Sequence, residues 1–180
     1  FFNIARENGT MEVLTHKLLY KFRKVTWAFP FIIFAINFIV GAGGAGSVAP
    51  QLLMSALIWP LSMALGMNII VLMVASWGGA VAGGGFFWSS EGVNRIAFYN
   101  EYGGPNGVSP DAVYLSVVEY SFVLLIALLF LTVLWYCIFR GWKVNKANVD
   151  EIFEDKSFDP IQKKTLILIG AVILCILVPA

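Results

Sequence analysis

The sequence predicts an all-α polytopic membrane protein that contains a re-entrant helical hairpin and a broken transmembrane helix. Composition is the first reason, because 59% of the 180 residues are hydrophobic and only 13% are charged, whereas about 25% are charged in a typical soluble domain. The second reason is the tract from Val25 to Ser90, which has no Asp, Glu, Lys, Arg or His. The third is that glycine and proline interrupt this tract where helices should cross lipid.

Several classes of function are disfavoured by what the sequence lacks. The net charge is +1, and no strip of basic and aromatic residues indicates a nucleic-acid partner. The sequence has no Ser/His/Asp set, no carboxylate pair at acid/base spacing, and no HExxH, CxxC or P-loop motif. We therefore expect a protein that is not an enzyme and whose immediate surroundings are the lipid bilayer.

Residues 1–24 are expected to contain the end of an upstream span and then an amphipathic interfacial helix. Residues 1–5 are mostly apolar, and Gly9 suits a turn. Beyond this turn, apolar residues recur at three- and four-residue spacing, and lysines and arginines favour the other side and the end. Since the chain begins at Phe1 and stops just after an apolar run, we expect a fragment of a longer polytopic protein.

Residues 25–66 are predicted to form a re-entrant hairpin with its tip at residues 41–50. The tip carries four glycines and a proline, which disfavour a continuous helix. The apolar segment before it, residues 25–40, is 16 residues long, and roughly 20 are needed to span a bilayer. The segment after it is interrupted by Pro60. Two short apolar segments joined in this way favour a hairpin over two full spans.

Residues 67–92 are predicted to form a broken transmembrane helix. Gly79 and the adjacent glycines at 83–85 loosen it, and a Ser-Ser-Glu-Gly run at residues 89–92 follows at the depth where the helix should still be crossing. An alternative interpretation makes the spaced small residues a face for close helix packing. We favour the break, because three of the glycines are adjacent in sequence.

The remaining residues are predicted to form loops and spans in alternation. Residues 93–112 are expected to be an external loop rich in turn signals, and Ser109-Pro110-Asp111 then starts a transmembrane helix at 113–140. We expect a cytoplasmic loop at 141–164 and the start of the next span at 165–180. Lysines and arginines cluster at 17–24, 140–146 and 163–164, whereas residues 91–111 contain one arginine and no lysine. The positive-inside rule therefore assigns the clusters to the cytoplasm.

The two interruptions are the places where ligand binding is expected. The ends of half-helices expose N–H groups that suit anions and C=O groups that suit Na⁺, an arrangement typical of secondary transporters. Glu91 would balance a cation or carry a proton, and Na⁺ would lie at Gly43, Ser47 and Ser90. We expect no other metal or cofactor. The candidate substrate- and ion-binding residues are Gly43, Gly44, Gly46, Ser47, Ser89, Ser90, Glu91 and Gly92.

At this point the sequence resembles a known family. The stretches that carry the resemblance are residues 4–10 (Ile-Ala-Arg-Glu-Asn-Gly-Thr), 41–50 with Leu52-Leu53-Met54, 80–92, 141–143 (Gly-Trp-Lys) and 158–160 (Phe-Asp-Pro). In this order and spacing they look like the first half of the dicarboxylate-carrier branch of the ion transporter superfamily, which includes MatC-type carriers, citrate transporters and divalent anion/sodium symporters. The resemblance covers most of the chain and is weakest at 93–112.

The resemblance implies an elevator transporter built of two inverted repeats, of which this chain is one half. The second half would belong to the same gene or to another chain, and the assembly would be a homodimer in the bacterial inner membrane. The function implied is secondary active transport of a di- or tricarboxylate-like anion, coupled to Na⁺ or H⁺. The alternative, argued from the glycines alone, is a non-transporting membrane subunit whose helices pack closely in a larger complex.

Two departures from the family pattern leave the coupling ion and the substrate open. The symporters have Ser-Asn-Thr at the hairpin tip, where this chain has glycines, alanine and Ser47. The carriers have Ser-Pro-Thr-Gly at the helix break, where this chain has Ser89-Ser90-Glu91-Gly92. An acidic residue there would replace a Na⁺ ligand, favour proton coupling or select another substrate.

Overall fold

The computed structural model describes residues 7–10, 13, 17, 20–21, 25–143 and 157–177, and within these ranges the chain is helical without a strand. The amphipathic helix predicted within residues 1–24 lies largely outside the described residues. The elements in chain order are η1 (Thr26–Ala28), α3 (Phe29–Val40), η2 (Gly41–Ala45), α4 (Val48–Leu65), α5 (Ile69–Gly84), α6 (Ser90–Gly103), η3 (Gly104–Asn106), α7 (Pro110–Ile138) and α9 (Pro160–Leu177).

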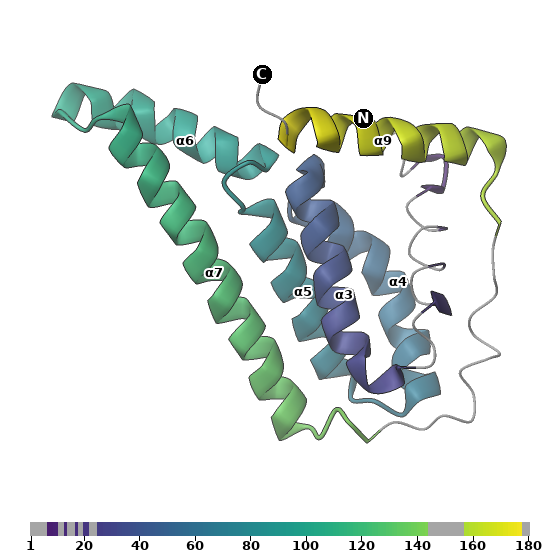
Figure 1. The fold of residues 1–180 in the computed structure, drawn as a ribbon. Coiled ribbons are helices and arrows are strands. Elements are labelled where there is room, and N and C mark those ends of the chain that lie inside the picture. The colour runs from purple at the N-terminus through teal and green to yellow at the C-terminus, as the bar shows by residue number, and fades with distance from the viewer. Residues whose placement is uncertain are drawn as a thin grey trace.

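Helix α5 lies at the centre of the fold. It packs against α3 and α4 on one side and against α7 on the other, and Figure 1 shows α7 inclined along this group. The larger core cluster joins α3, α4 and α5 and includes Phe29, Leu61 and Val71, all almost fully buried. A smaller cluster joins α3, α5 and α7 through Phe34, Ala75 and Leu128. The centre of the molecule is thus the hairpin packed on α5.

Two helices among the described residues are long and apolar enough to cross a membrane, namely Thr26–Ala45 and Pro110–Ile138. The first of them contradicts our argument from length, because the helical conformation continues past Val40 through a single π-helical turn, η2. Glycine makes this continuation feasible, since a Cβ at Gly41 would meet the backbone of Gly84 on α5 at 2.8 Å. Residues 25–66 do form a helical hairpin, whereas its re-entrance into a membrane remains a prediction.

Close packing of glycines joins α5 to α3. A Cβ at Gly79 would overlap the carbonyl group of Phe34, and a Cβ at Gly83 would overlap that of Phe38. We call these two contacts the glycine seam. Small residues that let helix backbones approach are the usual device for packing helices in lipid, where the hydrophobic effect between helices is absent. The packing interpretation of the spaced glycines therefore holds for Gly79 and Gly83.

The chain is also broken after these glycines, because α5 ends at Gly84 and α6 begins at Ser90. In Figure 1, α6 leaves the end of α5 at a steep angle and crosses toward the start of α7. The expectation of a loop from residue 93 onward was wrong, since α6 continues to Gly103. Ser89 starts this helix by accepting a hydrogen bond from the N–H of Gly92, and this cap outweighs the turn signals that only begin near residue 102.

The long helix α7 starts as predicted, with Ser109 accepting a hydrogen bond from the N–H of Ala112 and Pro110 in the first turn. Helix α9 lies crosswise at the end of the molecule where the hairpin turns, opposite the C-terminal end of α7 (Figure 1). The cations on α9 and those after α7, which the sequence groups together, therefore lie at opposite ends. Which side of a membrane each end faces, and whether α9 spans it, remain predictions.

Candidate functional site

The turn of the hairpin depends on glycine at two positions. Gly44 has φ 101° and Gly46 has φ 70°, a region in which an L-residue is disfavoured by roughly 1–2 kcal/mol. The chain leaves η2 at Gly44 and begins α4 at Val48, with Ser47 as its N-terminal cap residue. The Ser47 side chain makes no capping hydrogen bond to α4. The N-terminus of α4 thus needs partners from elsewhere in the chain.

The break between α5 and α6 is held from within by Ser89. Its side chain is fully buried, and its hydroxyl donates toward the carbonyl oxygens of Gly84 and Phe86 and accepts from the N–H of Gly92 at 3.0 Å. A Cβ at Gly92 would overlap the Phe86 carbonyl. Ser89 and Gly92, both candidate ligands, are therefore engaged in building the break.

The turn and the break contact each other directly. Oε1 of Glu91 accepts two hydrogen bonds from Ser47, one from its N–H at 2.6 Å and one from its hydroxyl at 2.8 Å. The hydroxyl of Ser90 lies 3.4 Å from the carbonyl oxygen of Gly44, a long hydrogen bond. We call these four residues the tip–break contact. It brings together parts of the chain that are 44 residues apart.

The electrostatics of this contact favour a negative charge. Ser47 caps α4, and Glu91 lies in the first turn of α6, so one carboxylate lies at the N-terminal ends of two helices. These ends carry partial positive charge and bind anions through their free N–H groups. Glu91 is half-buried, which limits the screening of the interaction by water. Glu91 therefore provides the partner that the N-terminus of α4 lacks.

The tip–break contact contains only part of the predicted set. Gly44, Ser47, Ser90 and Glu91 are in it, and Gly46 adjoins it, since its Cβ would lie 3.0 Å from Oε1 of Glu91. Gly43 lies half-buried in η2. The described residues include no group of three His, Cys, Asp or Glu side chains that would hold a metal ion. The oxygens of Gly44, Ser47, Ser90 and Glu91 are ligands of the hard type that Na⁺ takes in transporters.

Two polar features were missed at the level of the sequence. Asn37 on α3 is almost fully buried, and its amide donates to the backbone and side-chain oxygens of Ser76 on α5, at 2.9 and 2.8 Å. An asparagine within an otherwise apolar helix is a signal that marks such a pair. Arg95 was noted only as the single arginine of its segment.

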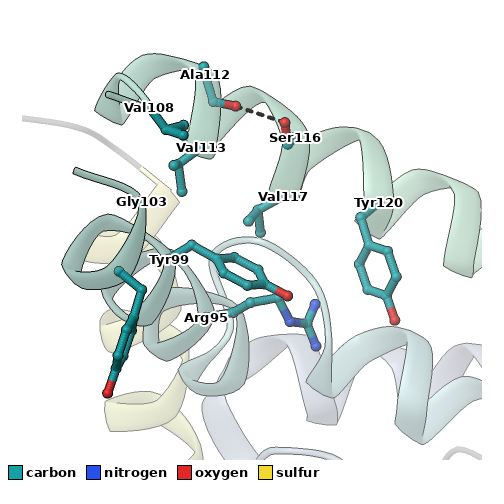
Figure 2. Close-up of a pocket in the computed structure, with 10 residues that line it drawn as sticks. Arg95, Tyr99, Gly103, Val108, Ala112, Val113, Ser116, Val117 and Tyr120 are labelled. Atoms are coloured by element: carbon teal, nitrogen blue, oxygen red, sulfur yellow. Dashed lines mark hydrogen bonds between the residues drawn. The ribbon is translucent and has the colours of Figure 1, made fainter. Parts of the chain in front are cut away.

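Arg95 lies in a cleft between α6 and α7 (Figure 2). The cleft has a volume of about 670 Å³ and is walled by tyrosines and small apolar residues. The guanidinium lies 4.7 Å from the ring centre of Tyr120 and 3.4 Å from the carbonyl oxygen of Gly85, at the C-terminal end of α5. Both contacts stabilise a cation. Arg95 thus connects α5, α6 and α7 directly behind the break.

An aromatic cluster surrounds the same break. The ring of Phe86 contacts Phe38 on α3, Trp88 in the break and Phe122 on α7, with ring centres 5.3, 4.4 and 5.4 Å apart. Edge-to-face geometry of this kind is favourable by about 0.5–1.5 kcal/mol per pair. The cluster fixes the start of α6 relative to α3 and α7, and hence the position from which Glu91 reaches the hairpin turn.

Comparison with known proteins supports the family resemblance for the first half of the chain. Residues 1–84 match the family model described as dicarboxylate carrier protein MatC N-terminus. No curated protein and no solved structure matches the chain. The matched part includes the hairpin and α5 and ends at the break, before Ser90 and Glu91. Residues 1–84 are therefore similar to the N-terminal part of MatC-type dicarboxylate carriers.

Proposed function

We propose that the chain forms one half of a secondary active transporter for a di- or tricarboxylate-like anion, with its binding site at the tip–break contact. The match to a carrier family favours transport over catalysis and over a subunit that serves packing alone. The observation that carries the proposal is the pair of hydrogen bonds from Ser47 to Glu91. They occupy the place where a helix N-terminus at interrupted backbone would bind an anionic substrate.

In this proposal Glu91 occupies the position that a substrate carboxylate takes. A carboxylate of the bound substrate accepts hydrogen bonds from the N–H and the hydroxyl of Ser47. The Glu91 side chain then moves away from the N-terminus of α4 to make room for it. Two carboxylates at one helix end repel each other, so binding is favoured when Glu91 is neutralised by a proton or by Na⁺. This exchange gives a physical basis for coupling substrate to H⁺ or Na⁺. The oxygens of Ser47, Ser90 and Glu91 supply ligands for the cation.

The wider assembly follows from the resemblance. A second, inverted half would supply a matching hairpin and break, and the two would enclose the substrate between them. Movement of this unit against a dimeric scaffold would carry the substrate across the bacterial inner membrane, as in elevator transporters. The dimer, the scaffold and the location belong to the proposal.

The test is uptake of labelled dicarboxylates by the complete protein in proteoliposomes, with and without a Na⁺ gradient and at several pH values. We expect saturable uptake, and loss of more than tenfold in rate with Ser90→Ala or Gly44→Val, since Gly44 has a positive φ. Matched controls are Ser116→Ala on the exposed face of α7 and Gly104→Val, where a Cβ meets nothing within 4 Å. Normal uptake in both site variants would overturn the proposal.

A further inference from the structure

Residues 139–143 form a loop after α7 that is held by backbone hydrogen bonds. The N–H groups of Phe139, Arg140 and Gly141 donate to the carbonyl oxygens of Trp135, Cys137 and Tyr136, at 3.0, 3.2 and 2.8 Å. Arg140 takes a positive φ of 50°, and a Cβ at Gly141 would overlap the ring of Tyr136. These bonds satisfy carbonyls at the C-terminal end of α7, whose partial negative charge would otherwise repel an anion.

This loop forms one wall of a cavity of about 380 Å³, and the turn between α4 and α5 forms the other. The lining residues are Gly66, Met67 and Asn68 from the turn and Phe139, Arg140, Gly141 and Lys143 from the loop. Two of them are cations and none is acidic. Both cationic side chains are exposed. Among the residues that the structure describes, neither side chain makes an ion pair or a side-chain hydrogen bond, and both charges line the cavity.

The surroundings of the cavity are those of a membrane–water boundary. Trp142 is half-exposed beside it, and Trp135 and Phe139 stack at 5.4 Å between ring centres. Tryptophan is enriched at this depth of a bilayer. Ile138 and Leu134 continue the surface along α7 as exposed apolar side chains, on a helix long enough to span. A ligand bound here meets cations at one end and an apolar helix face at the other.

We propose that this cavity binds the phosphate of an anionic phospholipid, with Arg140 and Lys143 as its cationic ligands and the outer face of α7 against its acyl chains. Arg140 suits a phosphate through paired N–H donors, and Lys143 adds a point charge. Clusters of cations at the end of a membrane helix attract anionic lipids, and each cationic side chain adds about fivefold to the affinity. The apolar face selects a lipid over a soluble phosphate, because only a lipid has chains that cover Ile138 and Leu134.

The test uses the complete protein in nanodiscs of phosphatidylcholine that contain a trace of brominated lipid, either phosphatidylglycerol or phosphatidylcholine. Bromine quenches nearby tryptophan, and the signal of Trp142 is obtained by difference from Trp142→Phe. We expect the anionic lipid to quench Trp142 preferentially, and Arg140→Gln with Lys143→Gln to lower this preference on the order of tenfold. Uptake is not measured, so the result is independent of the proposed transport.

The matched control is Lys163→Gln with Lys164→Gln, which removes the same charge from exposed positions on α9 at the other end of the molecule. It should leave the preference intact. Equal quenching by both lipids in the unaltered protein, or equal loss in the control, would overturn the proposal. So would loss of the preference on addition of glycerol phosphate, which has the headgroup chemistry without acyl chains and would assign the cavity to a soluble phosphate.

Discussion

At the scale of single residues, Glu91 is the side chain on which the candidate site depends. It interrupts a run of hydroxyl and glycine residues, and its Oε1 accepts both donors of Ser47. Hydrogen bonds to an ionised acceptor contribute about 1.5–3 kcal/mol each at most, and less when partly exposed. Asn37 and Ser76 form a second polar contact in the apolar interior, where they join α3 to α5. Among the described residues, Glu91 is the charged side chain that connects the two interrupted elements.

We expect Glu91→Gln to lower the KM for a dicarboxylate severalfold and to weaken the dependence of uptake on pH or Na⁺. Glutamine keeps an acceptor for Ser47 but removes the charge that repels the substrate. The measurement is the initial rate of uptake against substrate concentration in proteoliposomes at several pH values and Na⁺ concentrations. Glu101→Gln on the same helix, at an exposed position, is the control and should behave as the unaltered protein. An unchanged ion dependence in Glu91→Gln would make Glu91 a structural residue.

At the scale of elements, local chemistry predicted some features of this chain and missed others. The glycines at 41–46 predicted the hairpin turn, because two of them do adopt positive φ, and the cap at Ser109 predicted the start of α7. The length argument was incomplete because glycine also permits helical conformation, so the first arm of the hairpin continues past Val40 through η2 up to the kink at Gly44. Helix α6 was missed because Ser89 was considered as a ligand, whereas its hydroxyl caps the helix.

The cap at Ser89 gives a prediction for α6. Removing a capping hydroxyl destabilises a helix start by about 0.5–2 kcal/mol, and Ser89→Ala also leaves a buried N–H at Gly92 without its partner. We expect amide hydrogen exchange in residues 90–93 to speed up on the order of tenfold in detergent solution. Ser109→Ala removes the corresponding cap of α7, which is exposed and longer at 3.3 Å, and should change exchange in its helix less. Equal protection of residues 90–93 in both variants would contradict the role given to Ser89.

At the scale of the whole molecule, the contact between turn and break was beyond prediction from the sequence. Its partners are 44 residues apart, and each local pattern indicated only an interruption, not which interruptions meet. The contact between α3 and α5 is more extensive than the contact between α6 and the hairpin turn. Helices α3 and α5 are joined along the glycine seam, whereas α6 meets the hairpin turn mainly through Ser47, Ser90, Glu91 and Gly44. Displacing the Glu91 carboxylate would therefore loosen α6 from the hairpin turn, while Arg95 still holds α6 to α5 and α7.

The limited contact between α6 and the hairpin turn predicts which distances change when substrate binds. Spin labels at Val48 on α4 and Val93 on α6, both exposed, should report a longer or broader distance distribution when a dicarboxylate and the coupling ion are added. Labels at Met73 on α5 and Ile126 on α7, also exposed, should not. The measurement is pulsed electron paramagnetic resonance after replacement of Cys137 and Cys175 by serine. Identical distributions for the first pair with and without substrate would exclude release of α6.

The glycine seam has a further consequence for how the hairpin moves. At Gly79 and Gly83 a backbone carbonyl of α3 faces the Cα hydrogens of α5, and Cα–H···O contacts of this type contribute perhaps 0.5–1 kcal/mol each. They need no water to be favourable, so they persist at any depth in a bilayer. The first arm of the hairpin is consequently bound to α5 as a single rigid body. Opening of the hairpin by bending at Gly44 and Gly46 would therefore have to separate α4 from both α3 and α5, on which its buried side chains pack.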